Sequence, residues 1–251
     1  MKKINIVIAL ITVVGLILAG CAGEPEPAPE PAPVSGIVSG VPWSDRELAS
    51  YVIQDYEGST IGAAGLSLAR DMEGTYILKQ FYGFKQQVAA LLTMAKVRAD
   101  NLKPISGVVT LANISPAPVV EYSFDDGTLS IRVLDTEGDI TRDTIDIPED
   151  AYDDNELLFL LRAIPFKVGY TASFTNMIAA AAQKHVVTIT VVGEEELQVP
   201  AGSFDAYKIE LTMTGEKKYF WYGKDKPHYF LKLDDGSSVI VLEEIGAAYG
   251  F

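Results

Sequence analysis

Short runs of β-forming residues, separated by turn residues, follow one another along most of this chain and restrict the folds open to it. The clearest example is 122–133, where two alternating runs flank Asp125-Asp126-Gly127, a sequence that favours a tight hairpin. Residues 233–242 repeat this pattern around Asp234-Asp235-Gly236. Strands joined by such short turns form antiparallel sheets rather than βαβ units. The sequence therefore predicts a mainly β protein with an antiparallel sheet.

Further runs of the same kind predict more strands, at 48–54, 61–70, 75–84, 108–112, 186–192, 207–213 and 217–222. Only one helix is indicated: an acidic start at 153–156 precedes the apolar run 157–161, which ends before Pro165. The segment 176–183 is open to two interpretations. Its alanines favour a helix, whereas the runs on either side of it read as strands.

The first residues have the pattern of an export signal. Lys2 and Lys3 precede an apolar run at 4–18, which is shorter than the roughly 20 residues that span a bilayer. The run ends in Leu18-Ala19-Gly20-Cys21, which resembles the lipobox of bacterial lipoproteins, where a diacylglycerol is attached to the cysteine thiol before cleavage. We expect residues 1–20 to be a lipoprotein signal peptide and Cys21 to carry lipid. The alternative is an ordinary signal peptide with an incidental cysteine.

A Pro/Glu/Ala-rich tract, 24–34, follows the cysteine. Its prolines fix φ and remove backbone donors, so we expect an extended tether that lifts the domain about 30 Å from the bilayer. A connection with Gly, Ser and Pro continues over 35–44. These segments predict a lipidated tether over 21–44 and a globular domain over 45–251.

Charge and cysteine content exclude several classes of protein. The formal net charge is −14, and an acidic surface is repelled by phosphate backbones and anionic headgroups. We therefore expect no nucleic-acid partner, and membrane association through the lipid alone. With its single cysteine lipidated, the chain has no thiol left for a disulfide or a thiolate metal site.

Motifs for catalysis and cofactor binding are missing from the sequence. It has two histidines, His185 and His228, and no HExxH, GxSxG, GxGxxG or GxxxxGK[ST] motif. The acidic residues of 135–154 lack the order of an EF-hand loop, which predicts a solvated face or loop rather than a calcium site. We expect no enzymatic activity, no cofactor and no metal site.

Two groups of residues are candidates for ligand binding. The strand at 61–65 has small residues, so Ile61, Ala63 and Ala64 either permit the sheet to curve or leave room for a ligand. Tyr219 and Trp221 belong to an aromatic group, with Tyr222, Tyr229 and Phe230, that either fills the core or offers a platform for a sugar or lipid.

A family resemblance extends over 47–245. Residues 194–211, which contain Val-Pro-Ala-Gly-Ser-Phe, are followed by the aromatic run 219–222 and a closing strand at 239–245. Together with three upstream segments (58–64, 99–104 and 156–162), this order resembles the exported bacterial domain-of-unknown-function family 3108. The resemblance implies an architecture similar to that of the lipoprotein carriers LolA and LolB: one strongly curved antiparallel sheet, an incomplete barrel, with one or two covering helices.

Two functions from different classes follow as hypotheses. The first is a non-catalytic lipoprotein, anchored on the outer side of the cell membrane or in an outer membrane, whose curved sheet binds a hydrophobic ligand or an acylated partner. The second is a structural or protein-interaction module of the cell envelope without a small-molecule ligand. A hydrolase ranks third and would require carboxylates that converge in a cleft.

Overall fold

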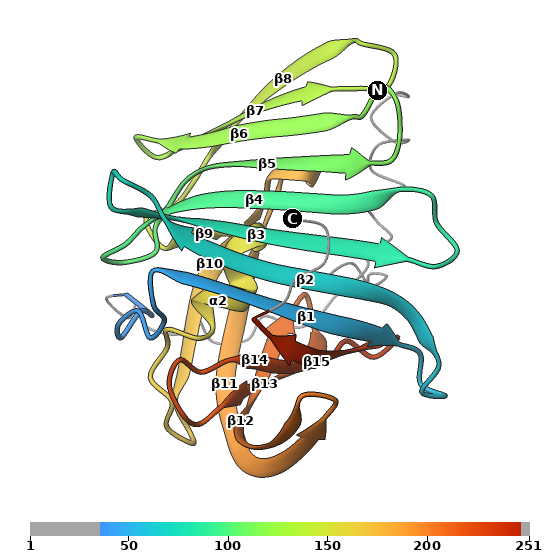
Figure 1. Ribbon diagram of the computed structural model, residues 1–251. Helices are drawn as coiled ribbons and strands as arrows, with labels where there is room; N and C mark the ends of the chain where they lie inside the picture. The colour runs from blue at the N-terminus through green and yellow to red at the C-terminus, as the bar shows by residue number, and fades with distance from the viewer. Residues whose placement is uncertain (1–35, 247–251) are drawn as a thin grey trace.

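The computed structural model describes residues 36–246, and these form one large, open, strongly curved sheet (Figure 1). The predicted signal peptide, Cys21 and the tether over 24–34 lie outside the described residues. The described residues form these strands and helices in chain order: β1 (Arg46–Gln54), β2 (Thr60–Arg70), β3 (Thr75–Phe84), β4 (Ala90–Arg98), β5 (Pro104–Ala112), β6 (Val119–Asp125), β7 (Thr128–Leu134), β8 (Ile140–Asp146), β9 (Ala151–Asp153), η1 (Asp154–Glu156), α2 (Leu157–Leu160), β10 (Thr171–Ile178), η2 (Ala179–Ala181), β11 (Gln183–Val199), β12 (Gly202–Met213), β13 (Glu216–Gly223), β14 (Phe230–Asp234) and β15 (Val239–Ile245). None of the helices in residues 36–246 has the length and apolarity needed to cross a membrane.

The strand order places the first and last strands side by side in the middle of the sheet. The order is β8-β7-β6-β5-β4-β3-β2-β1-β15-β14-β13-β12-β11-β10-β9. β1 pairs with β2 on one side and with β15 on the other, both antiparallel. The sheet is not closed into a barrel, although its two ends approach each other where Lys184 Nζ on β11 donates to the Asp146 carbonyl on β8, 3.1 Å away.

The predicted fold class is confirmed, with one exception to antiparallel pairing. β9 pairs in parallel with β10, because η1, α2 and the loop after them carry the chain back to the same edge. Both Asp-Asp-Gly hairpins are present. In the first, Asp125 pairs with Thr128, and Asp126 and Gly127 both have positive φ, as a type I′ turn requires.

The inner, concave face of the sheet is covered by η1 and α2, which lie between its two halves (Figure 1). The predicted acidic start is confirmed as a capping box, in which Asp153 accepts from backbone N–H groups and Glu156 accepts from the Asp153 N–H. The α-helix itself has only four residues, all buried. Tyr222 on β13 donates to the Leu158 carbonyl at 3.0 Å and ties the helix to the sheet.

The expectation that Asp153 and Asp154 belong to a solvated face or loop is wrong. Asp153 is 0% exposed and Asp154 is half-buried, because capping the helix draws both residues under the sheet. The acidic residues of β8 do lie on a solvated surface, but on a strand at the sheet edge rather than in a loop.

The segment 176–183 is neither a regular helix nor a plain turn. β10 continues to Ile178, the three alanines of η2 form a 3₁₀ turn, and Ala182 has positive φ. Ile178 then pairs with Gln183, so β10 and β11 form a hairpin around η2.

The folded part begins before the predicted boundary at residue 45. Ile37 and Trp43 are both buried in the core, and the backbone N–H of Ser39 donates to the Ala163 carbonyl at 2.7 Å. Residues Ile37, Ser39 and Trp43 are therefore packed into the fold and do not belong to an open linker.

Candidate functional site

The five residues predicted to bind a ligand do not share one surface. Ala64 lies on the inner face of β2, 1% exposed, between its cross-strand neighbours Tyr51 and Tyr82. Because side chains alternate along a strand, Ile61 and Ala63 are on the opposite, outer face. Tyr219 and Trp221 are also on the outer face, but on β13, with β1, β15 and β14 between them and β2.

Trp221 is covered by charged side chains rather than open to a ligand. The Nζ atoms of Lys208 and Lys232 lie 4.8 Å and 4.6 Å from the centre of its ring, and its Nε1 donates to Glu195 Oε1. Its side chain is 4% exposed as a result. Tyr219 is half-buried beside it and donates to Glu210 Oε2 at 3.1 Å.

The small residues of β2 have an explanation within the sheet. A Cβ atom on Gly62 would lie 2.5 Å from the Gly83 carbonyl oxygen of β3 and 3.3 Å from Phe84 Cα. The backbones of β2 and β3 therefore approach closely at this point, which supports the interpretation of 61–65 as a site of curvature.

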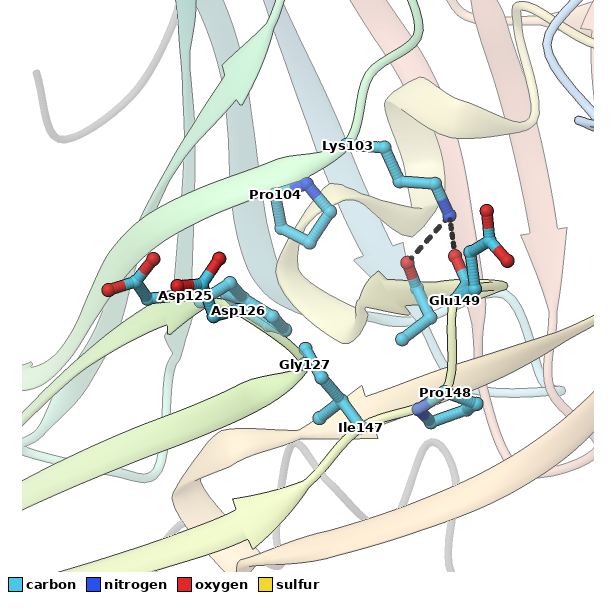
Figure 2. A pocket seen from close by; sticks show the side chains of 10 residues that line it. Lys103, Pro104, Asp125, Asp126, Gly127, Ile147, Pro148 and Glu149 are labelled. Carbon is cyan, nitrogen blue, oxygen red and sulfur yellow. Dashed lines mark hydrogen bonds between the residues drawn. The ribbon is translucent and has the colours of Figure 1, made fainter.

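A groove of about 480 Å³ lies where three distant segments of the chain meet (Figure 2). We call it the Lys103 groove. It lies between the start of β5, the β6–β7 turn and the connection from β8 to β9. Its lining residues are Lys103, Pro104, Phe124, Asp125, Asp126, Gly127, Ile147, Pro148, Glu149 and Ala151.

Hydrogen bonds hold the walls of the Lys103 groove in place. Lys103 Nζ donates to the carbonyl oxygens of Glu149 at 2.8 Å and Ala151 at 3.1 Å, as Figure 2 shows. The Ile147 N–H donates to the Gly127 carbonyl at 2.8 Å and joins the β8–β9 connection to the β6–β7 turn. Since both connections are anchored, the groove is formed before any ligand arrives.

The lysine at this groove is already engaged by the protein. Its Nζ lies 3.9 Å from the centre of the Tyr152 ring, and burial lowers its pKa despite the nearby carboxylates of Glu156, Asp150 and Glu149. The other charged residues that line the groove, Asp125, Asp126 and Glu149, are exposed acids. The rim of the groove thus carries exposed carboxylates, beside the half-buried side chains of Phe124 and Ile147.

Three acids at the start of η1 form the interior carboxyl cluster: Asp153 and Glu156, which are buried, and Asp154, which is half-buried. Tyr122 donates to Asp153 Oδ2 at 2.5 Å, and Asn176 donates to Asp154 Oδ1 at 2.7 Å. Burial raises the pKa of Asp153 to about 7 and that of Asp154 to about 6. It also raises the pKa of Glu156 well above its usual range.

Two of the three members of the interior carboxyl cluster are closed to solvent. Asp153 and Glu156 are 0% exposed. Raised carboxyl pKa values often mark catalytic acids, but a catalytic acid must reach its substrate. The hydrogen bonds of Asp153 and Asp154 instead link η1 to β6 and β10, which is a structural role.

Two other features lie on the surface of the described residues. A hollow of about 490 Å³ between the β2–β3 and β4–β5 turns is lined by charged residues that pair with one another or with close neighbours, such as Arg98 with Asp100 at 3.3 Å and Glu73 with Lys96 at 2.5 Å. In the β7–β8 turn, carboxylate oxygens of Asp135, Glu137 and Asp139 lie within 4.8 Å of one another. Asp135 Oδ1 also accepts the backbone N–H groups of Glu137 and Asp139, each at 2.9 Å.

The Lys103 groove was not predicted from the sequence. The Asp125-Asp126-Gly127 motif predicts a turn, but nothing in the order of residues shows that this turn lies beside Lys103 and Glu149. The segments meet because the sheet curves, and curvature is a property of all its strands together.

Comparisons with known proteins give one family match and weak structural matches. A family model described as "Protein of unknown function (DUF3108)" matches residues 50–243. A search of curated proteins found no match. A solved structure from Parabacteroides distasonis, provisionally described as a lipoprotein, is 12% identical with a TM-score of 0.34; the match covers 84% of this chain and 100% of that chain. A structure from Bacteroides fragilis, provisionally described as an exported protein with a YmcC-like fold, is 9% identical with a TM-score of 0.37 and the same coverage of both chains.

Proposed function

The chain belongs to the DUF3108 family, and on that premise we propose that it is an exported lipoprotein, anchored through lipid at Cys21, that binds a partner protein in the Lys103 groove without catalysis. The partner binds outside the curved sheet rather than within it. The protein acts as an interaction module on the extracytoplasmic side of a membrane, and the tether sets its distance from the bilayer.

The anchor is supported by the sequence Leu18-Ala19-Gly20-Cys21 after a charged and apolar leader. We expect the full-length protein to incorporate labelled palmitate in its host and to sediment with membranes. The Cys21→Ala variant should lose the label and accumulate with its leader attached, because the thiol that takes the lipid is absent. Equal labelling of both proteins would contradict the lipoprotein assignment.

The observation that carries the interaction function is the filled inner face of the sheet. Leu160 and Leu161 of the α2 region are 0% exposed, and the Tyr222–Leu158 hydrogen bond secures the helix against β13. The space that a hydrophobic ligand would occupy in an incomplete barrel is thus taken by the protein's own side chains. The Lys103 groove lies outside this core and is preformed.

The experiment that tests this function is site-specific photocrosslinking in the host. A benzophenone amino acid at Asp125, which lines the groove, should trap a discrete protein adduct. The same group at Val88, which is exposed in the β3–β4 connection at the opposite end of β4 from Lys103, should not. Adducts of equal yield at both positions, or at neither, would contradict a partner in the groove.

A separate experiment tests the hypothesis that the sheet binds a hydrophobic ligand. Burial of an acyl chain contributes about 0.8 kcal/mol per methylene, so a site of moderate size would give micromolar affinity. Such a site at Ala64 would require η1 and α2 to leave the inner face. Saturable uptake of a fluorescent fatty acid by the wild-type protein, or a lipid that co-purifies from its host, would favour a carrier similar to LolA and LolB over the interaction module.

A further inference from the structure

The charge of the Lys103 groove indicates what its partner must carry. Asp125, Asp126 and Glu149 line it with three exposed carboxyl groups, and Figure 2 shows Asp125 and Asp126 on one side and Glu149 on the other. The single amine, that of Lys103, donates to two backbone carbonyls at the groove wall. The groove therefore has an excess of negative charge that its own lysine does not offset.

Apolar surface accompanies these carboxylates. Phe124 and Ile147 are both half-buried, with Pro104 and Pro148 beside them. The volume of about 480 Å³ is in the range of sites that enclose a few side chains. A ligand that satisfied both features would place a cation near the carboxylates and an apolar group against Phe124 and Ile147.

The net charge of the whole chain also favours a cationic partner. With a formal net charge of −14, the protein attracts cationic partners over distances near the Debye length and repels acidic ones. Complementary charge at a groove rim raises association rates and excludes partners of the wrong sign.

We infer that the Lys103 groove binds a basic segment of a partner protein, in which lysine or arginine residues stand next to large apolar ones. The inference rests on the proposed function and specifies the chemistry of its partner. Cations of the segment pair with Asp126 on one wall and Glu149 on the other, and its apolar side chains pack on Phe124 and Ile147.

The test uses three fluorescent hexapeptides and the full-length protein in detergent. The basic peptide alternates lysine with leucine, the neutral one has glutamine in place of lysine, and the acidic one has glutamate. We expect the basic peptide to bind, the neutral peptide to bind about fivefold to tenfold more weakly, and the acidic peptide not to bind. Binding of the basic peptide should weaken as salt is raised.

Two double variants that each remove two negative charges distinguish binding at the groove from a general effect of the chain's negative charge. Asp126→Asn with Glu149→Gln removes two charges from the groove, and asparagine preserves the turn because Asn-Gly suits the positive φ at this position. Glu137→Gln with Asp139→Asn removes two charges from the β7–β8 turn, at the other end of β7. We expect the first pair to weaken binding of the basic peptide about fivefold to tenfold and the second to leave it unchanged.

Each alternative outcome has a defined meaning. Equal loss in both variant pairs, or equal affinity for the basic and neutral peptides, overturns the inference. If no peptide binds but the benzophenone at Asp125 still traps a partner, the inference fails and the interaction function stands. If the benzophenone traps nothing either, both fail.

Discussion

Asp153 is a buried carboxyl group whose protonation is coupled to folding. Its pKa in the folded protein is raised to about 7 by burial, from an ordinary value of 3.8. Between these two pH values the folded protein holds a proton that the unfolded chain has lost, so the free energy of unfolding falls as pH rises through this window. Asp154, with a pKa raised to about 6, acts in the same direction.

The Asp153→Asn variant should show a weaker pH dependence of stability. Each unit of pKa difference corresponds to about 1.4 kcal/mol, so the wild-type protein should lose a few kcal/mol between about pH 5 and about pH 7.5. The variant should lose less, because the amide does not ionise. Urea unfolding at a series of pH values measures this, with Asp143→Asn on the exposed β8 as the control that keeps the wild-type slope. An unchanged slope in Asp153→Asn would rule out this role for Asp153.

At the residue scale, the sequence predicts where a helix is capped better than it predicts which side chains are buried. The acidic start at 153–156 was correctly expected to cap a helix, because capping depends on residues next to one another. That the same acids lie inside the protein depends on Tyr122 and Asn176, more than twenty residues away in either direction, and the local pattern contains no such information.

At the scale of the element, Gly62 allows the backbones of β2 and β3 to approach each other closely. We expect Gly62→Ala to destabilise the protein by about 1–3 kcal/mol, since its Cβ would meet the Gly83 carbonyl at 2.5 Å and the backbone must shift. Gly193→Ala on β11, where a Cβ would meet nothing within 4 Å, is the matched control and should stay within about 0.5 kcal/mol of wild type. Chemical unfolding measures both. A Gly62→Ala protein as stable as the Gly193→Ala protein would show that β2 and β3 are not held so closely.

Besides the three-residue β9, two longer strands escaped prediction, and for different reasons. β4 is rich in Ala, Leu, Met and Lys, which favour helix, and its strand conformation comes from pairing with β3 and β5 on both sides. β8 is exposed along nearly its whole length and carries four charged or hydroxyl residues in a row, so it has no apolar alternation to detect. Strands with alternating patterns or marked turns, such as β6 and β7, were predicted well.

At the scale of the whole molecule, the net charge of −14 governs the response to cations. We expect millimolar calcium to raise the melting temperature no more than magnesium does, because the carboxylates of the β7–β8 turn are exposed or half-exposed and Asp135 already accepts two backbone N–H groups. Differential scanning calorimetry with each salt tests this. A large rise specific to calcium would instead reveal a site formed by Asp135, Glu137 and Asp139.

The pairing of β1 with β15 sets the order in which the molecule can be completed. During synthesis β1 emerges early, whereas its neighbour β15 is among the last segments to arrive. Contacts between residues so far apart in the chain slow folding, because a long loop must close before they form. A chain whose synthesis has stopped before Val239 would leave one edge of β1 unpaired in the middle of the sheet, and such an intermediate would be exposed to proteases and chaperones until the final strand was made.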